Sequence, residues 1–279
     1  MTVLTSQQTR LLESWLGSWE AIDDYSWPLQ DTLVLHVRGQ AGEHIIKASQ
    51  TSHHIAREIE AYQKVLSGIT APIPQLQHAD IDAGVLVTSF LPGILVLDSP
   101  GEWSPDVYRQ AGEILAEIQV PQGISSRYLD ELLSGVEILM VDANGLIPQS
   151  QLEALSIELG KFQSYPIQLH FTHGDYQPRN WLTNDGMLSV IDFGRGAQRS
   201  CVSDLVRLQN QQFLDNPELA DAFMEGWGRI LANDDLELLR LETLRESIGT
   251  VVWAHRIGDK EFEEHGRRMI VRYLDSIER

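Results

Sequence analysis

The segment from His173 to Asn180 carries side chains whose types and spacing suit phosphoryl transfer. It reads His-Gly-Asp-Tyr-Gln-Pro-Arg-Asn, and Asp192 begins an Asp-Phe-Gly triplet a short distance later. In this pattern the first aspartate accepts the proton of an attacking hydroxyl, while the asparagine and the second aspartate hold a metal ion. The sequence therefore predicts Asp175 as the catalytic base, and Asn180 and Asp192 as ligands of Mg²⁺.

A strand, a turn and a second strand are expected between the two metal-ligand candidates. Segments 181–183 and 187–191 have strand character, and the Asn-Asp-Gly sequence between them is a strong hairpin signal. Asn180 and Asp192 lie six residues either side of Gly186. Folding the hairpin should bring them to the same end, roughly 5 Å apart if they pair directly across it.

Phosphoryl transfer also needs a fixed cation near the phosphates, commonly a strand lysine paired with a helix glutamate. Lys47, in Ile-Ile-Lys-Ala, stands on a predicted strand. Glu58 and Glu60 compete to be its partner. Glu58 lies on the buried edge of the predicted helix beside Ile59, whereas Glu60 points roughly 200° away at 100° per residue. We therefore expect Glu58 to pair with Lys47.

Two further residues are assigned supporting roles around the predicted base. His173 is more often a structural residue in such a loop than a second base. Asp204, in Ser-Asp-Leu, could hydrogen-bond the loop from a following helix. An acid that only favours the helix macrodipole is an equally good interpretation of Asp204.

The elements that position these residues change character along the chain. Thr5 and Gln8 resemble a capping box for a first helix that ends at Gly17. A β-hairpin is expected from segments 31–37 and 43–48, an amphipathic helix over 52–66 and a buried strand over 84–90. The Pro-Gly step at 92–93 is a hinge signal. Helices are then expected near 105–118, 128–140 and 149–161 and over most of 217–278.

This order of elements predicts an α+β fold with two lobes. Residues 1–91 form a small N-terminal β-sheet lobe with a helix, which binds nucleotide. Residues 92–279 form a larger, mainly helical C-terminal lobe for catalysis and acceptor binding.

Composition limits the classes of partner. The 279 residues include 21 basic and 40 acidic side chains, a formal charge of -19, which repels nucleic acids and anionic membranes. The same field could attract a cationic substrate. Residues 1–8 show no secretion signal, the longest apolar stretch is interrupted well short of the ~20 residues of a spanning helix, and Cys201 is alone. A cytoplasmic protein without nucleic-acid or membrane partners is expected.

The motifs HGDYQPRN, VIDFG and SDL resemble those of the aminoglycoside phosphotransferase and choline kinase superfamily, relatives of protein kinases that phosphorylate small molecules. The resemblance extends to Lys47 and to Leu-Val-Thr-Ser-Phe-Leu-Pro-Gly at 86–93. It implies the two-lobed protein-kinase-like fold and ATP or GTP as co-substrate. It further implies that the adenine bonds the backbone at Ser89 and Leu91, that Lys47 reaches the phosphates, and that Asp175 deprotonates the acceptor.

Three positions depart from the pattern of the superfamily. The expected phosphate loop, residues 24–30, contains no glycine, the helix near 105–118 lacks a terminal His, and Arg179 stands where a small residue is common. The first departure raises the alternative of a nucleotide-binding pseudokinase or regulatory module. A protein kinase is disfavoured because no Ala-Pro-Glu motif follows Asp192.

The main expectation is a small-molecule kinase acting on a hydroxyl, with an aminoglycoside or another polar antibiotic as one acceptor. A choline-like amine, an amino alcohol or a sugar is equally allowed. The sequence gives no indication of oligomeric state. Acidic residues after Asp204 are candidates for ammonium contacts by location only, namely Asp221, Glu225, Glu246 and Asp259.

Overall fold

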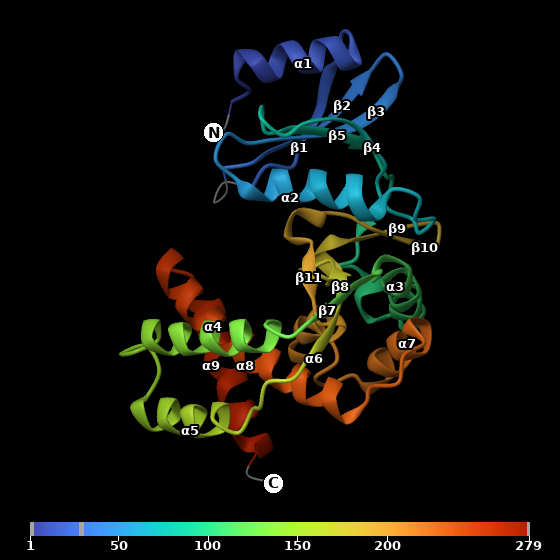
Figure 1. Cartoon of the computed structure of the whole chain (residues 1–279). Coiled ribbons are helices and arrows are strands. Elements are labelled where there is room, and N and C mark those ends of the chain that lie inside the picture. Colours follow the sequence, from blue (N-terminus) through green and yellow to red (C-terminus); the bar gives the residue numbers. More distant parts are fainter. Residues whose placement is uncertain (1–2, 28–30, 278–279) are drawn as a thin grey trace. The chain divides into compact units, whose positions relative to one another are not determined.

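The computed structural model describes residues 3–27 and 31–277, and shows the predicted α+β architecture (Figure 1). Residues 28–30 of the glycine-free loop lie outside the described residues. The chain divides into two compact units. The first comprises Met1–Val120, Phe171–Ala197 and Asn216–Arg229, and the second comprises Pro121–His170, Gln198–Asp215 and Ile230–Arg279. The predicted lobe boundary at residues 91–92 stays a prediction.

An antiparallel five-stranded sheet forms the N-terminal part of the first unit. Its order is β1-β2-β3-β5-β4, so that β1 and β4 lie at the edges. The predicted hairpin is confirmed as β2 and β3, although its turn is shorter than expected because the strands extend to Gly39 and Gly42. The strands are β1 (Glu20–Asp24), β2 (Leu33–Gly39), β3 (Gly42–Ala48), β4 (Leu76–Asp80) and β5 (Val85–Ser89).

Two helices cover opposite faces of this sheet (Figure 1). The first, α1 (Ser6–Leu16), has the predicted Thr5–Gln8 capping box and ends at Gly17. The second, α2 (His53–Ala61), starts after Ser52, whose hydroxyl accepts from the His54 amide, and continues into a π-helical turn, Tyr62–Leu66. The predicted helix over 52–66 is therefore confirmed, with a wider last turn.

Strand alternation decides which side chains face which helix. Leu12 and Leu16 of α1 share a core with Ile46, Ala48, Val85 and Val87. On the other face, Ile55 and Ile59 of α2 pack on Leu86. Since Lys47 lies between Ile46 and Ala48, its side chain projects toward the α2 face of the sheet.

The rest of the first unit places a small sheet beside two helices. The sheet has the order β10-β9-β6, with β6 at Ile94–Leu95, β9 at Trp181–Asn184 and β10 at Met187–Val190. Helices α3 (Pro105–Ile118) and α7 (Pro217–Trp227) pack closely on each other. The bounds of α3 agree with the prediction.

The second unit is mainly helical, as expected for this part of the chain. Strands β7 (Pro121–Ser125) and β8 (Ile167–Thr172) pair antiparallel, and neither they nor β11 (Ala197–Arg199) were predicted. None of the helices described over 3–27 and 31–277 is long and apolar enough to cross a membrane. The helices are α4 (Tyr128–Asp142), α5 (Gln149–Leu159), α6 (Val206–Asn210), α8 (Asn233–Ile257) and α9 (Lys260–Ile277).

Candidate active site

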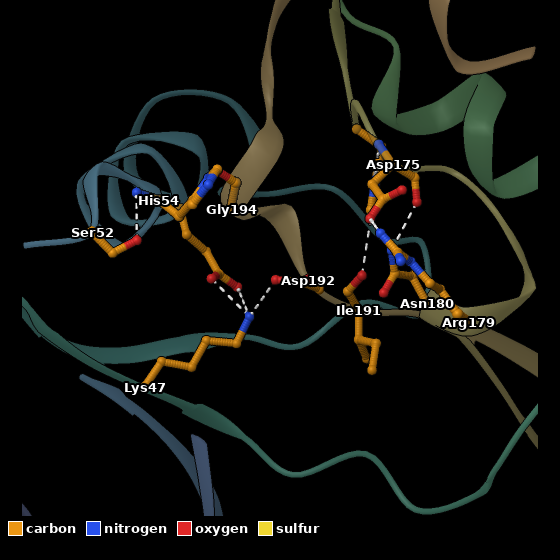
Figure 2. A network of polar contacts seen from close by, with 11 residues as sticks. Lys47, Ser52, His54, Asp175, Arg179, Asn180, Ile191, Asp192 and Gly194 are labelled. Atoms are coloured by element: carbon orange, nitrogen blue, oxygen red, sulfur yellow. Dashed lines mark hydrogen bonds and ion pairs between the residues drawn. The ribbon is translucent and has the colours of Figure 1, made fainter. Parts of the chain in front are cut away.

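Lys47 is the centre of an ion cluster in the first unit. Its Nζ donates to both carboxylate oxygens of Glu58, at 2.9 and 2.8 Å, and to Oδ1 of Asp192 at 2.7 Å. Figure 2 shows the Lys47 ammonium pointing toward Asp192. The structure thus joins a strand of the sheet, helix α2 and the Asp-Phe-Gly triplet through one cation.

The helix phase selects Glu58, as predicted, over Glu60. The side chain of Glu58 is only 3% exposed. Glu60 is 52% exposed and pairs with Lys64 one turn further along the helix. Glu58 faces the sheet because it shares a stripe with Ile55 and Ile59, both of which are buried.

The three charges shift one another's protonation in opposite directions. Burial disfavours the charged form of Lys47, but the carboxylates of Asp192 and Glu58 outweigh it and raise the pKa of the lysine. Burial raises the pKa of Glu58, with Lys47 opposing the effect. The charge of Lys47 lowers the pKa of Asp192. Lys47 and Asp192 are therefore charged near neutral pH.

Asp192 adopts a backbone conformation that is unusual for a non-glycine residue. Its φ of 70° and ψ of 71° lie in the left-handed region. Such a conformation costs on the order of 1–3 kcal/mol and persists where neighbouring contacts hold it. Here the fully buried Phe193 anchors the next position, and the Gly194 carbonyl bonds Nδ1 of His54 at 2.8 Å (Figure 2).

The hairpin register differs from the expectation by one residue. Trp181 pairs with Val190, and the Ile191 amide donates to the Asn180 carbonyl at 2.9 Å. Asn180 therefore lies across from Ile191, and the predicted direct pairing with Asp192 is wrong. The cause is a two-residue turn in which Asp185 and Gly186 both have positive φ, so that the hairpin is centred between them.

The His173–Asn180 segment, here called the base loop, buries Asp175 at 3% exposure. The Asp175 amide donates to Nδ1 of His173 at 3.2 Å, and Nε2 of His173 faces the Ile191 carbonyl at 2.9 Å. A proton on Nε2 satisfies both contacts. His173 thus ties the base loop to the hairpin, which agrees with its predicted supporting position.

Two side chains hold the carboxylate of Asp175. Nε2 of Gln177 donates to Oδ1. Nη2 of Arg179 donates to Oδ2 (Figure 2). The sequence interpretation gave neither residue a role. The short 3-10 turn Pro178–Asn180 brings Arg179 back over the aspartate, and spacing alone did not reveal this turn.

The candidate metal ligands present oxygen atoms, which suit Mg²⁺. Nδ2 of Asn180 donates to the Asp175 carbonyl at 2.8 Å, which leaves its Oδ1 as an acceptor. The Asp192 side chain is 49% exposed, with Oδ1 on Lys47. The described part of the chain contains no group of three or more His, Cys, Asp or Glu side chains placed to hold a metal.

Three other predicted positions are less directly constrained. The Ser89 amide already donates to the Gln75 carbonyl at 2.9 Å, so only the Ser89 carbonyl could serve a nucleobase there. Leu91 follows the end of β5. Asp204 is buried in the 3-10 turn Cys201–Leu205 of the second unit, so its contact with the base loop stays a prediction.

The acidic candidates for acceptor contacts after Asp204 all lie on or beside helices, and two of them have local partners. Glu246 pairs with Arg207 at 2.9 Å. Asp259 accepts from the Phe262 amide at 3.0 Å and so caps α9. Asp221 and Glu225 lie on α7.

Tyr62 is a residue of the site that sequence reasoning missed. Its hydroxyl is buried and has no hydrogen-bond partner among the residues described. Burial raises the pKa of the Tyr62 hydroxyl, and the negative charges of Glu58 and Asp192 raise it further. Its position at the start of the π-helical turn gave no sequence signal.

Solved structures of low identity share the fold. The GDP complex of aminoglycoside 2'-phosphotransferase-IIIa matches with a TM-score of 0.66 and 14% identity over 97% of this chain and 98% of that one. Macrolide 2'-phosphotransferase MphH from Brachybacterium faecium gives 0.65 and 16% over 93% and 95%. A thermostable mutant of aminoglycoside phosphotransferase APH(4)-Ia with ADP and hygromycin B gives 0.67 and 14% over 98% and 99%. These likenesses confirm the two-lobed, kinase-like fold.

Sequence comparison identifies the family. No curated protein matches the chain. The model of the phosphotransferase enzyme family matches residues 31–241, a span that contains the lysine cluster, the base loop and the hairpin. The chain therefore belongs to the phosphotransferase enzyme family.

Proposed function

We propose that this phosphotransferase moves the γ-phosphate of ATP or GTP to a hydroxyl group of a small molecule. The observation that carries the proposal is the ion cluster of Lys47, Glu58 and Asp192, which lies in the same compact unit as the base loop. Phosphoryl transfer depends mainly on positioning and charge stabilisation, and this cluster supplies both.

The donor side uses the charged residues of the cluster. Glu58 holds the Lys47 ammonium in place, and Lys47 binds phosphate oxygens of the nucleotide. Asn180 and Asp192 would hold Mg²⁺, since one offers an amide oxygen and the other a half-exposed carboxylate. The metal ion would neutralise negative charge on the phosphates.

The acceptor side depends on Asp175. Its buried carboxylate orients the acceptor hydroxyl and takes the proton as the new P–O bond forms. In a loose transition state this proton transfer is late, so position matters more than basicity. Transfer is direct and in line, without a covalent phosphoenzyme. His173 supports the loop through its bond to the Ile191 carbonyl.

The nucleotide and the acceptor are specified more weakly. We infer that the nucleobase meets the backbone at Ser89, the last residue of β5, and at Leu91 just past it. Three of the similar structures contain GDP, GDP with kanamycin, and ADP with hygromycin B, and these ligands support a nucleotide donor and an antibiotic acceptor. An amino alcohol or a sugar remains an alternative acceptor. The cytoplasmic location rests on the sequence alone.

The test is a coupled assay of ADP or GDP release, with and without Mg²⁺, against aminoglycosides, macrolides, amino alcohols and sugars. Acceptor-dependent release that requires Mg²⁺ is expected. Asp175→Asn should lower turnover by about 10² to 10⁴ because it removes the general base. Asp185→Asn, on the exposed hairpin turn, is the matched control and should retain activity. Full activity of Asp175→Asn would refute the assignment.

A nucleotide-binding module without turnover is the second candidate. The absence of glycine from residues 24–30 favours it, because glycine allows close backbone approach to phosphates. This candidate would be supported over the kinase by two results together. Nucleotide would raise the melting temperature of the protein, and no acceptor of the panel would cause release of ADP or GDP.

A further inference from the structure

Arg179 is a cation that contacts the proposed base directly. Its Nη2 donates to Oδ2 of Asp175, four residues earlier in the chain. Gln177 donates to the other oxygen, Oδ1. Both oxygens are thus held, one by a neutral amide and one by a full positive charge.

The two donors differ in burial as well as in charge. Gln177 is 6% exposed, and the carboxylate it holds is 3% exposed. The side chain of Arg179 is 42% exposed, so its guanidinium lies at the rim of the base loop. Gln177 therefore orients the carboxylate from inside the protein, while Arg179 adds a charge on the side open to solvent.

That charge changes what the base presents to an acceptor. An isolated carboxylate would attract an ammonium group next to the reacting hydroxyl. For unit charges about 5 Å apart, a dielectric between those of a protein surface and of water gives on the order of a tenfold effect on affinity. A guanidinium bonded to the same carboxylate cancels most of this attraction.

We propose, on the basis of the proposed function, that Arg179 is a positioning and specificity residue that neutralises Asp175 toward the acceptor. The site then takes hydroxyls whose neighbouring groups are uncharged or anionic, in preference to hydroxyls flanked by an ammonium group. An acceptor that is cationic elsewhere in its structure is still accommodated. This rule concerns only the reacting hydroxyl and its immediate neighbours. The overall charge of the protein acts on the acceptor as a whole and does not set this local preference.

The experiment compares acceptors that differ only beside the hydroxyl. Glucose with glucosamine, and glycerol with serinol, replace a hydroxyl by an ammonium group at nearly constant size. The ratio of kcat/KM within each pair is measured with Mg²⁺ and nucleotide. Where a pair is not phosphorylated, its inhibition constants against the best acceptor of the broad screen replace kcat/KM.

The variants separate charge from structure. Arg179→Met should shift the ratio on the order of tenfold toward the ammonium-bearing member. Arg179→Lys should keep the ratio near that of the unmodified protein because the charge remains. Gln177→Met should slow both members equally, since it removes an orienting donor without changing charge. Arg256→Met removes a comparable arginine–aspartate pair, at 2.7 Å to Asp142, and should change nothing.

Two results would overturn the proposal. One is an equal loss for both members of each pair in Arg179→Met, which indicates a purely structural role. The other is an unmodified protein that prefers the ammonium-bearing members as strongly as the variant does. Melting curves show whether Arg179→Met folds, and Arg179→Gln is the second neutral variant if it does not. Absence of phosphorylation of every acceptor rejects the proposed function itself, which is a separate outcome.

Discussion

Lys47 binds two carboxylates that differ in their access to solvent. The side chain of Glu58 is 3% exposed, whereas that of Asp192 is 49% exposed. The lysine therefore has one permanent partner and one that faces the region where a nucleotide and its metal ion would bind. Binding of a metal ion by Asp192 would loosen its bond to Lys47 and free the ammonium for phosphate oxygens.

Removing the cation should make stability depend on pH. In Lys47→Met the buried Glu58 loses the charge that opposes its desolvation, so its pKa rises further above 4.5. The folded state then binds more protons than the unfolded state, and stability falls as the pH rises from about 4.5 through the folded pKa. At neutral pH the loss should be about 3 kcal/mol.

Melting temperatures between about pH 5 and pH 8 measure this effect. Lys47→Met combined with Glu58→Gln is the control, because the amide does not titrate and the part of the pH dependence that comes from Glu58 should vanish. Parallel curves for the unmodified protein and Lys47→Met would contradict the expectation.

The choice of Glu58 over Glu60 predicts unequal effects of one chemical change. Glu58→Gln weakens the hold on Lys47, so the KM for nucleotide should rise on the order of tenfold. Glu60→Gln removes only an exposed pair with Lys64, which contributes about 0.3–0.5 kcal/mol, and should leave kinetics unchanged. Steady-state kinetics with varied nucleotide compare the two, and equal KM values would remove Glu58 from the site.

At the scale of elements, glycine lets α3 and α7 approach at backbone distance. A Cβ on Gly226 would lie 1.9 Å from the Arg109 carbonyl oxygen, and one on Gly112 would lie 2.2 Å from that of Phe223. Between these helices and the base loop, Tyr176 is buried and its hydroxyl donates to the Ala111 carbonyl at 2.6 Å. The helix pair thus supports the residue that follows Asp175.

Gly226→Ala should therefore destabilise the protein by about 1–3 kcal/mol, because helix backbone must move to admit the methyl group. Gly135→Ala on α4 is the matched control, since nothing lies within 4 Å of its added Cβ. That change should be neutral or stabilising by up to about 1 kcal/mol. Chemical denaturation measures both, and equal stabilities would show that α3 and α7 can separate without cost.

The sequence predicted the long helices better than the short strands, for a physical reason. The amphipathic stripe of α3 repeats several times, and the helix begins at Pro105, so both its period and its start are clear. In contrast, β1 is exposed at every position and β6 has only two residues, so neither shows alternation. Pairing with neighbouring strands creates these elements, and pairing is not visible in a local window.

The candidate site was predictable where periodicity applies and not where the chain turns. Strand alternation and helix phase were enough to pair Lys47 with Glu58. The register of the hairpin depended on the turn type at Asp185, which moved the partner of Asn180 by one residue. The contacts of Arg179 depended on a single 3-10 turn, which has no sequence period.

At the scale of the whole molecule, charge acts over two ranges. The formal charge of -19 produces a long-range field that attracts cations, whereas the pair of Asp175 and Arg179 is locally neutral. A cationic acceptor should therefore be drawn to the protein, yet gain little at the reacting hydroxyl. Salt can separate the two effects. At 0.1 M it screens the long-range field beyond about 10 Å, but it acts little on two charges in direct contact.

Raising the salt concentration should lower kcat/KM for a cationic acceptor of the screen and leave that for an uncharged acceptor nearly unchanged. The reason is that steering of a cation by the net charge weakens steeply with ionic strength. Arg179→Met changes the formal net charge only from -19 to about -20. The salt dependence of kcat/KM should therefore match that of the unmodified protein, even while the preference within acceptor pairs shifts. Steady-state kinetics over a salt series measure both quantities, with the uncharged acceptor as control. A salt dependence that changes strongly in Arg179→Met would show that one local charge, and not the field of the whole protein, governs the capture of cations.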